Sequence, residues 1–443
     1  MDKMNSRITR CTQITRRTLC QVIASGLPAL APKLLQASAG NEPPGWVEIE
    51  TTLIDHDATP FGTFQSHNQN IVANRNGVFL TYIRSRNEDY TAQHWRLMRS
   101  TDGGRTFSVV YEATDTTSAP AMETDEQDNL YLYRPNWVTG RGYLYRFLDD
   151  NDYRSPIVTD FDLKSASGKY SMMYDGRRKT LYVAQNPFWF VALSTEGKVL
   201  RKTKLWSRGE RASLEYPQLS LAADGTIHVA WTTNVHGKYW YRSIHHMQSP
   251  DAGANWRRMD GAPLQPPVTP DDPAVAQQIS QANENDDHTW LANFATKQGK
   301  VHFSYATLEV ENSKLKTMTY LRYDTSTGRR DVQHTPEFRG EKIALNKSSG
   351  FFATNATKDS PLFCVMADND RIACLASVDH GRTWTDHARD ETKYAGAYAI
   401  SGCRDTSGGY ILGSFTDRQQ PGGDPLQQSA VYFFRIKANA QID

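Results

Sequence analysis

Four side chains in the first half of the chain combine residue types that suit proton transfer beside a carboxylate. They are two proton carriers and two fixed cations: His67, Tyr170, Arg84 and Arg134. Arginine presents a planar fork of donors that can bind a carboxylate through two parallel hydrogen bonds. Histidine and tyrosine can accept or donate a proton when they are held against the reacting group. Together these types suit β-elimination from a uronic acid.

Elimination from a uronate removes the proton at C5, beside the carboxylate, and expels the group at O4. The step is difficult because the neighbouring carboxylate is already an anion. Arg84 and Arg134 would neutralise that carboxylate and stabilise the enediolate. Tyr170 would act as general acid or base, and His67 as base or as a donor to the carboxylate, with the two roles interchangeable. This chemistry requires no organic cofactor, and the chain has no nucleotide-binding motif.

A second group of residues is expected to bind the substrate around the same pocket. They are Asn68, Arg86, Trp137, Tyr216, His236, His288 and Trp290. The alternative is that polar residues line a wet channel mouth and that the tryptophans are buried core aromatics. No CxxC or HExxH spacing occurs, so no zinc site can be derived from the sequence. A structural calcium ion is compatible with the chain, but no local spacing specifies one.

The elements that must position these residues are marked by an octapeptide that occurs three times. It has the form Ser-x-Asp-x-Gly-x-Thr/Asn-aromatic and occupies residues 100–107, 249–256 and 377–384. The Asp can accept hydrogen bonds from its own turn, the Gly can adopt positive φ, and the aromatic residue can enter the core. A decayed copy occupies 194–197. The octapeptide predicts a tight turn in a repeated β unit.

Strand-like segments recur at the interval expected of four-stranded units, which predicts an all-β, seven-bladed β-propeller, with six blades as the alternative. The predicted blades open near residues 67, 119, 170, 216, 288, 351 and 398. A strand over 46–54 is expected to pair with the last blade and to close the ring. We expect one propeller domain over 40–443, although this length would accommodate two or three average domains.

The strand order decides which residues lie together. If the octapeptide turns join the third and fourth strands of their blades, they all lie on one face. First strands then begin, and second strands end, on the opposite face. Because the candidate residues occupy those positions, we expect them to converge around one mouth.

Two resemblances support this interpretation. The octapeptide resembles the Asp-box, or BNR, turn of sialidase-like β-propellers. The chain is also similar to seven-bladed polysaccharide lyases of the ulvan-lyase and rhamnose–glucuronate-lyase kind, through Ser66-His67-Asn68-Gln69-Asn70, Arg134 in the segment 131–137, and Tyr170. The second resemblance implies β-elimination on an acidic polysaccharide or oligosaccharide.

Two positions depart from the pattern of those lyases. Arg84 occupies the place of a second histidine, and Ser118 occupies the place of a blade-two tyrosine that usually serves as acid or base. Tyr170 would replace that tyrosine, or His67 would act with a different partner. The substitution Arg134→Ala is expected to abolish turnover without unfolding the protein.

Two other functions are compatible with the sequence. A sialidase-like glycoside hydrolase would share the octapeptide but needs an arginine triad and a Tyr–Glu pair. Glu215-Tyr216 offers such a pair, yet neighbours in a strand point to opposite faces. The second is a non-catalytic propeller that binds glycans or protein, which the missing tyrosine at Ser118 favours. Its sugar-stacking platforms would be Trp137, Trp189, Trp240 and Trp290.

The first 39 residues are expected to form an export signal. Arg16-Arg17 precedes a mildly apolar segment over 20–31, and Ala37-Ser38-Ala39 has a small-x-small cleavage pattern. The paired arginines favour a twin-arginine signal over an ordinary Sec signal, so we expect a periplasmic or secreted protein.

The mature chain would be nearly neutral. Removal of residues 1–39 leaves 44 basic and 48 acidic residues, so the formal charge changes from +1 to −4. Such a balance argues against nucleic acid as a partner. No internal apolar run reaches the ~18 residues that span a bilayer, and we expect a monomer. Cys364 and Cys374 lie symmetrically about 368–370, so they could face each other across a hairpin and form a disulfide; free buried thiols are the equal alternative.

Overall fold

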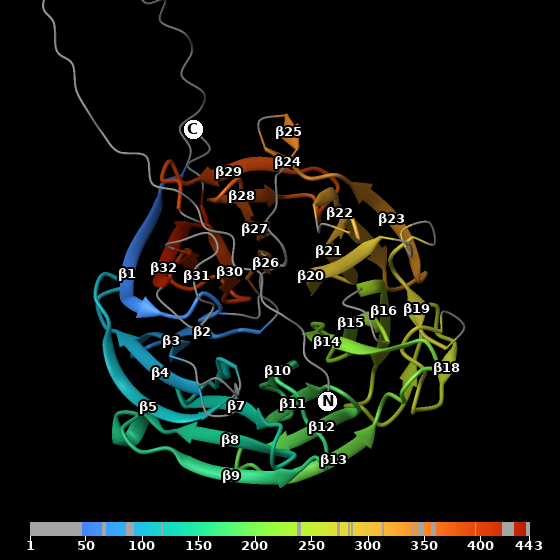
Figure 1. Ribbon diagram of the computed structural model, residues 1–443, viewed down its shortest axis with the longest axis horizontal. Helices are drawn as coiled ribbons and strands as arrows, with labels where there is room; N and C mark the ends of the chain where they lie inside the picture. Colours follow the sequence, from blue (N-terminus) through green and yellow to red (C-terminus); the bar gives the residue numbers. More distant parts are fainter. Residues whose placement is uncertain are drawn as a thin grey trace, which may run out of the picture. The chain divides into compact units, whose positions relative to one another are not determined.

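The computed structural model describes residues 47–63, 68–85, 93–116, 118–236, 241–272, 275–281, 284, 287–311, 314–338, 340–342, 350–355, 360–394, 396–418 and 429–439. The predicted export signal lies outside these residues. The described residues belong to one compact unit, Trp46–Asp443. Within it, seven antiparallel sheets follow one another around a ring (Figure 1). The fold is an all-β, seven-bladed β-propeller, and the six-bladed alternative is wrong.

The blades follow the chain in order. Blade 1 consists of β2 (Ile71–Asn74), β3 (Gly77–Ser85), β4 (Gln93–Ser100) and β5 (Ser108–Thr116). Blade 2 consists of β6 (Ala121–Thr124), β7 (Leu130–Asn136), β8 (Arg141–Phe147) and β9 (Ile157–Asp162). Blade 3 consists of β10 (Tyr170–Asp175), β11 (Thr180–Gln185), β12 (Trp189–Ser194) and β13 (Val199–Lys204). Blade 4 is β14 (Ala212–Leu221), β15 (Ile227–Val235), β16 (Tyr241–Ser249), β17 (Trp256–Arg257) and β18 (Pro263–Leu264), with β19 (Gln277–Gln278) paired to β16. Blade 5 consists of β20 (His288–Lys297), β21 (Lys300–Leu308), β22 (Leu315–Asp324) and β23 (Arg329–His334). Blade 6 consists of β26 (Gly350–Ala353), β27 (Leu362–Asp368), β28 (Arg371–Ser377) and β29 (Thr385–Arg389). A small hairpin, β24 (Glu337–Phe338) and β25 (Glu341–Lys342), separates blades 5 and 6.

Blade 7 joins the two ends of the unit. It consists of β30 (Ala397–Gly402), β31 (Tyr410–Arg418), β32 (Ser429–Lys437) and β1 (Ile49–Ala58). β1 pairs antiparallel with β32, from Ile49 opposite Ile436 to Ala58 opposite Ser429. Figure 1 shows this blue strand beside the red strands of the last blade. The predicted closing strand is confirmed, and it extends past residue 54 to Ala58.

The core consists of apolar clusters between neighbouring blades. Val72 and Phe79 of blade 1, for example, pack with Leu130 and Phe147 of blade 2. Phe351 of blade 6 packs in the same way with residues of blade 7. Because each inner strand is covered on both faces, the second strands read as nearly continuous apolar runs rather than as alternating patterns.

The three octapeptides form the turns β4–β5, β16–β17 and β28–β29, between the third and fourth strands of blades 1, 4 and 6. The carboxylate of Asp102 accepts hydrogen bonds from the backbone nitrogens of Arg105 and Thr106, both at 2.9 Å. Asp379 accepts the equivalent bond from the nitrogen of Thr383 at 2.9 Å. Burial opposes ionisation of Asp379, but these bonds outweigh it and lower the pKa of Asp379 to about 2.

Each octapeptide glycine lies against an aromatic ring of the preceding blade. Gly104 has a φ of +93°, and a Cβ there would overlap the ring of Phe433. A Cβ at Gly253 would overlap the ring of Phe190. The turns therefore fasten one blade to the next, which explains why the octapeptide requires glycine at this position.

The expectation that Cys364 and Cys374 face each other is wrong. The β27–β28 hairpin turns through two residues with positive φ, Asn369 and Asp370, so Asp368 pairs with Arg371. This register places Cys364 opposite Leu375 and Cys374 opposite Val365. The two thiols therefore lie on opposite faces of the sheet, in separate clusters. Both are free and buried, and burial raises the pKa of each.

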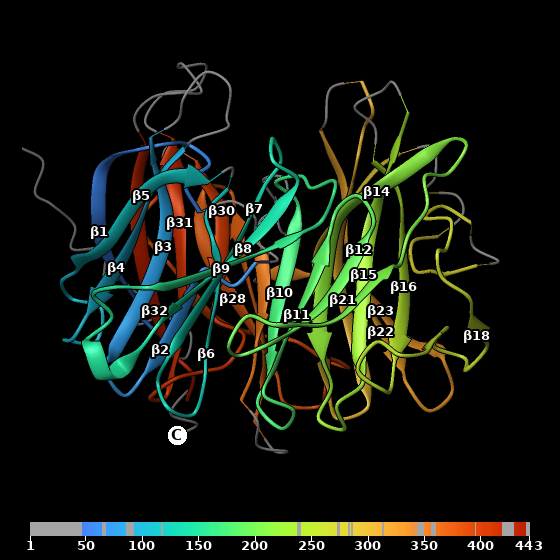
Figure 2. The ribbon, with the colours of Figure 1, turned by 90° about the horizontal axis from the view of Figure 1, so that it is seen from below.

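The strands run between two faces of the propeller (Figure 2). We call the face with the octapeptide turns the turn face. The other, where first strands begin and second strands end, is the candidate face. The described ranges include the 3₁₀ turn Asp149–Asn151. None of the helical segments in those ranges has the length and apolar character of a membrane span.

Candidate functional site

All the predicted site residues that the structure describes lie at the candidate face. Except for Tyr216, which lies in the middle of β14, they occupy starts of first strands, ends of second strands or the turns beside them: Asn68, Arg84, Arg134, Trp137, Tyr170, His236, His288 and Trp290. His67 and Arg86 lie outside the described residues. The contacts of the described residues separate them into distinct groups.

The first group surrounds Arg134 between blades 1 and 2. We call Asp115, Arg134 and Tyr145 the Arg134 group. Arg134 forms an ion pair with Asp115 at 2.6 Å, and both Nε and Nη2 donate to the hydroxyl of Tyr145. Tyr145 in turn donates to Asp115, which also accepts the indole N–H of Trp95 at 2.9 Å.

The Arg134 group is closed to solvent on the arginine side. The Arg134 side chain is 4% exposed, and its guanidinium lies over the ring of Tyr143, 4.2 Å from the centroid. Burial raises the pKa of Tyr145, as does its hydrogen bond to Asp115. Because Asp115 already neutralises Arg134, a substrate carboxylate would have to compete with an internal partner.

Tyr170 lies close to this group and is fully buried. Its hydroxyl donates to the backbone oxygen of Ala119 at 2.8 Å, and its ring meets that of Tyr133 at 5.2 Å. Burial raises the pKa of Tyr170, against the opposing charge of Arg134. The structure thus brings Tyr170 and Arg134 together, in a setting where the phenol stays protonated.

Arg84 is tied to the outermost strand of blade 7. Its guanidinium pairs with Asp55 at 3.0 Å and with Asp57 at 2.5 Å. Tyr82 also donates to Asp55 at 2.7 Å. No ion pair or hydrogen bond in the described part of the chain joins Arg84 to the Arg134 group. Like Arg134, Arg84 thus already has internal carboxylate partners, and the clamp formed by the two arginines stays a prediction.

The second group lies between blades 3 and 4. We call Lys169, Glu215 and Tyr216 the Lys169 group. The ammonium of Lys169 forms an ion pair with Glu215 and lies over the ring of Tyr216, 4.8 Å from the centroid. The side chains of Lys169 and Glu215 are 29% and 15% exposed. Burial raises the pKa of Glu215, and the charge of Lys169 only partly offsets this.

A β-bulge explains why Glu215 and Tyr216 both reach Lys169. The register of β14 against β15 shifts between Glu215 and Gln218, and Tyr216 has a φ of +47°. A bulge interrupts the alternation of side chains along a strand. Glu215 and Tyr216 therefore do not have to point to opposite faces of the sheet. A positive φ at a bulky residue is also costly, and such strain occurs most often at functional sites.

Three aromatic residues of blades 4 and 5 extend the Lys169 group. The ring of Tyr216 lies 4.7 Å from that of Trp290, and Tyr241 lies 4.6 Å from Trp290. His288 packs against Tyr241 at 4.9 Å. These contacts bring Tyr216, His288 and Trp290 together. His288 and Trp290 are 1% and 6% exposed, so they support Tyr216 from beneath rather than offer a surface.

The remaining predicted binding residues differ in exposure. Trp137 is 48% exposed in the β7–β8 turn, as a stacking platform requires. His236 has its Nδ1 3.2 Å from the oxygen of Glu210, and its buried Nε2 has no partner among the described residues. Asn68 is 2% exposed, and its Oδ1 likewise has no hydrogen-bond partner in the described part of the chain.

Five residues of these groups were absent from the predicted site. They are Asp115, Tyr145, Lys169, Glu215 and Tyr241. The sequence offered Glu215 only for the hydrolase alternative, where strict alternation argued against it. Tyr241 begins a third strand and Asp115 closes a fourth, and both of these strand ends also reach the candidate face. Lys169 immediately precedes a predicted residue. A search that covered all four strand ends of each blade would have found Tyr241, Asp115 and Lys169, whereas Tyr145 lies mid-strand and carries no such signal.

Comparisons with known proteins support the fold. No family model and no curated protein matches the chain. Among solved structures, the polysaccharide lyase PL25 ulvan lyase superposes with a TM-score of 0.61 at 10% identity, over 86% of this chain and 95% of that one. The same lyase bound to -[GlcA(1-4)Rha3S]- gives the same values. The polysaccharide lyase Uly1 gives a TM-score of 0.61 at 11% identity, over 89% of this chain and 100% of that one. At such identities the likeness shows the seven-bladed fold.

Proposed function

We propose that the protein cleaves an acidic polysaccharide by β-elimination on the candidate face, with the Lys169 group as its reactive centre. One observation carries the proposal. The β14 bulge brings a partly exposed cation and a carboxylate of raised pKa together with a buried phenol. The likeness of the fold to two polysaccharide lyases supports it.

Each member of the group has a chemical role in this proposal. Lys169 binds the uronate carboxylate and stabilises the negative charge that develops on it. The substrate carboxylate thereby replaces Glu215 as the partner of the ammonium. Glu215 is then released as the base that removes the C5 proton, and its raised pKa suits it to that step near neutral pH. The hydroxyl of Tyr216 protonates the departing O4.

The other predicted residues support this centre. Trp137 stacks on a neighbouring sugar ring, because its indole is half exposed on the same face. Arg134 and Tyr170 act as positioning residues, since their polar groups are already engaged with Asp115, Tyr145 and Ala119. His67 keeps its predicted role as a donor to the substrate carboxylate. Export to the periplasm or medium, which would place the protein beside such polymers, is part of the same proposal.

A second candidate function is glycoside hydrolysis at the same place. Sialidase-type chemistry uses a tyrosine nucleophile beside a glutamate. The contact of both Glu215 and Tyr216 with Lys169 meets that requirement for proximity. An arginine triad for the substrate carboxylate is not found among the described residues of this group. Elimination needs one cation there, and Lys169 provides it.

Absorbance and reducing-end assays on the same samples test the proposal. The protein would be incubated with ulvan, rhamnose-capped glucuronans and glycosaminoglycans. Elimination produces a 4,5-unsaturated uronate, so ultraviolet absorbance should increase together with new reducing ends. New reducing ends without absorbance would indicate hydrolysis. No signal in either assay across these uronate polymers would contradict an enzymatic function and favour a glycan-binding propeller.

A further inference from the structure

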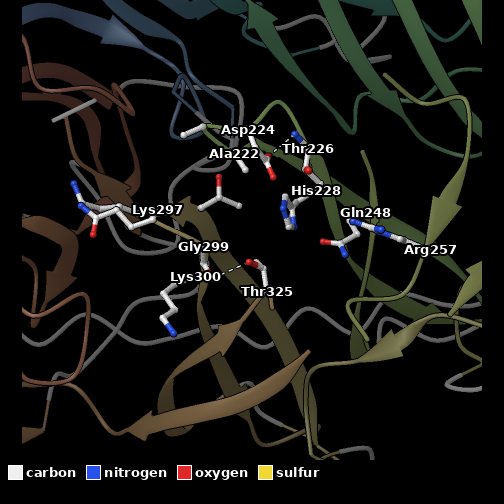
Figure 3. Close-up of a pocket in the computed structure, with 13 residues that line it drawn as sticks. Ala222, Asp224, Thr226, His228, Gln248, Arg257, Lys297, Gly299, Lys300 and Thr325 are labelled. Atoms are coloured by element: carbon white, nitrogen blue, oxygen red, sulfur yellow. Dashed lines mark hydrogen bonds between the residues drawn. The ribbon is translucent and has the colours of Figure 1, made fainter. Parts of the chain in front are cut away.

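A polar pocket lies on the turn face, between blades 4 and 5. It has a volume of about 290 Å³. Its walls are the β14–β15 turn, the β20–β21 turn and the adjoining strand ends (Figure 3). Both turns join first strands to second strands, so the pocket opens on the face opposite the Lys169 group. A volume near 300 Å³ is at the lower limit for small-molecule sites and would accommodate one sugar unit.

The pocket has a cation with no internal counterion. Arg257 lines it, and no carboxylate in the described ranges lies within ion-pair distance of that guanidinium. The Nε of Arg257 is also buried without a hydrogen-bond partner among those residues. Its neighbour Arg258, by contrast, pairs with Asp260 at 3.2 Å. A buried donor without a partner costs about 1–3 kcal/mol, so an anion at this position would relieve a real penalty.

The other two cations of the pocket have internal partners. Lys300 pairs with Asp324 and Asp331. Lys297 donates to the hydroxyls of Thr354 and Ser360. Arg257 is therefore the cation in the pocket that is best placed to receive an anion.

A buried histidine lies between this cation and a carboxylate. His228 is 1% exposed and lines the pocket, and its ring is held by a 3.1 Å contact between its Nδ1 and the Nε2 of His246. Its other ring nitrogen is then the atom that can meet a ligand. Burial, together with the charge of Arg257, lowers the pKa of His228 to about 4 despite the opposing charge of Asp224, so the ring is neutral near pH 7.

The pocket thus has two chemically different ends. Arg257 would bind an oxyanion, and Asp224 would accept hydrogen bonds from hydroxyl groups, with His228 and Gln248 between them (Figure 3). The Asp224 carboxylate would repel a bare anion that filled the whole cavity. A ligand with an anionic group at one end and hydroxyl groups at the other satisfies both ends.

We propose that this turn-face pocket binds one anionic monosaccharide unit, with its carboxylate or sulfate on Arg257 and its hydroxyl groups on Asp224 and His228. The site is separate from the Lys169 group and does not depend on the reaction there. An inorganic oxyanion shares part of this chemistry, and the experiment below distinguishes the two sources.

Calorimetric titration of the full chain tests this site. The probes are sodium glucuronate, glucose and sodium sulfate, and the Lys169→Met background removes binding at the candidate face. Glucuronate should bind at least tenfold more tightly than either glucose or sulfate. Arg257→Gln should weaken glucuronate binding about tenfold, since it removes a charge-assisted pair. The matched control Arg258→Gln on the neighbouring residue should leave the affinity unchanged.

Several results would overturn the proposal. Equal affinities in Arg257→Gln and Arg258→Gln would show that Arg257 does not hold the ligand. Sulfate binding as tight as glucuronate binding would indicate an inorganic anion site, and absence of binding by all three probes would exclude the site. If Arg257→Gln does not fold, Arg257→Lys is the alternative variant. It keeps the positive charge but loses the planar pair of guanidinium donors, so it should weaken glucuronate binding about threefold.

Discussion

The Arg134 group and the Lys169 group have the same ingredients in different settings. Each joins a cation, a carboxylate and a tyrosine at the candidate face of the propeller. In the Arg134 group the cation is 4% exposed and Asp115 is 38% exposed, and Asp115 and Tyr145 bond to one another as well as to the cation. In the Lys169 group both charged side chains are partly exposed, and the backbone is strained at Tyr216. The comparison indicates that the first group holds two blades together, whereas the second is available to a substrate.

The largest expected effect is on activity in the Lys169 group. Lys169→Met should reduce turnover about 10³-fold, because the enediolate would lose its cation. Some loss in the free energy of unfolding is also expected, because Glu215 is only 15% exposed and would lose its counterion. Initial rates and urea unfolding measure the two quantities. Lys204→Met is the control, because Lys204 also lies over an aromatic ring, 4.9 Å from the centroid of Phe188, at the end of β13. Equal rates in the two variants would remove Lys169 from the mechanism.

For the Arg134 group, we expect the larger effect on stability rather than on activity. Arg134→Ala should lower the free energy of unfolding by about 2–4 kcal/mol, because it leaves a carboxylate and a phenol without their partner. This revises the sequence-based expectation that the variant would lose activity alone. Urea unfolding measures the effect, and Arg141→Ala, at a solvent-exposed pair with Asp160, is the control. Stability equal to that of the control would show that the pair of Arg134 and Asp115 is not structural.

A smaller effect on activity is expected at Trp137, which belongs to neither group. Trp137→Ala should raise KM about fivefold to tenfold and leave kcat and stability unchanged, because the indole is exposed and would contact only distant sugar rings. Steady-state kinetics on a polymeric substrate measures this. An unchanged KM would show that the substrate does not extend over blade 2.

The smallest effect is a pH dependence of stability from Glu215. The pKa of Glu215 is raised in the folded protein, so between its unfolded value and its folded value the folded state binds more protons than the unfolded state. Stability contributed by this group is full below the unfolded pKa and decreases as the pH rises through the folded pKa. Glu215→Gln should flatten that decrease above about pH 4.5. Thermal unfolding from pH 4 to 7 would show it, and identical slopes in both proteins would contradict it.

The sequence predicted the architecture because the octapeptide and the strand repeats are local signals. The turn at 100–107 needs its own Ser, Asp and Gly, so its residues identify it without the rest of the fold. Ring closure by β1 was predictable for a related reason, since a lone strand before the first repeat has one partner left.

The site was less predictable because it depends on pairing between strands. The partners of Arg134 come from β5 and β8, and no feature of the sequence near Arg134 indicates that Asp115 is its ion-pair partner. The bulge at Tyr216 has no glycine to mark it, so strict alternation along β14 was a reasonable but wrong assumption. The prediction that Cys364 and Cys374 face each other was wrong for a similar reason. The hairpin turn has two residues rather than three, which shifts the strand register by one residue.

The most direct test of the account compares one carboxylate from each group. Glu215→Gln removes the negative charge that pairs with Lys169, and Asp115→Asn removes the one that pairs with Arg134. Both substitutions keep nearly the same side-chain shape, and both lie on the candidate face. Initial rates of unsaturated-uronate formation should decrease at least 10²-fold in Glu215→Gln, because the base is lost. The rate of Asp115→Asn should stay within about threefold of the unmodified protein, measured where both remain folded. A large loss in Asp115→Asn with normal activity in Glu215→Gln would place the chemistry in the Arg134 group and contradict the account.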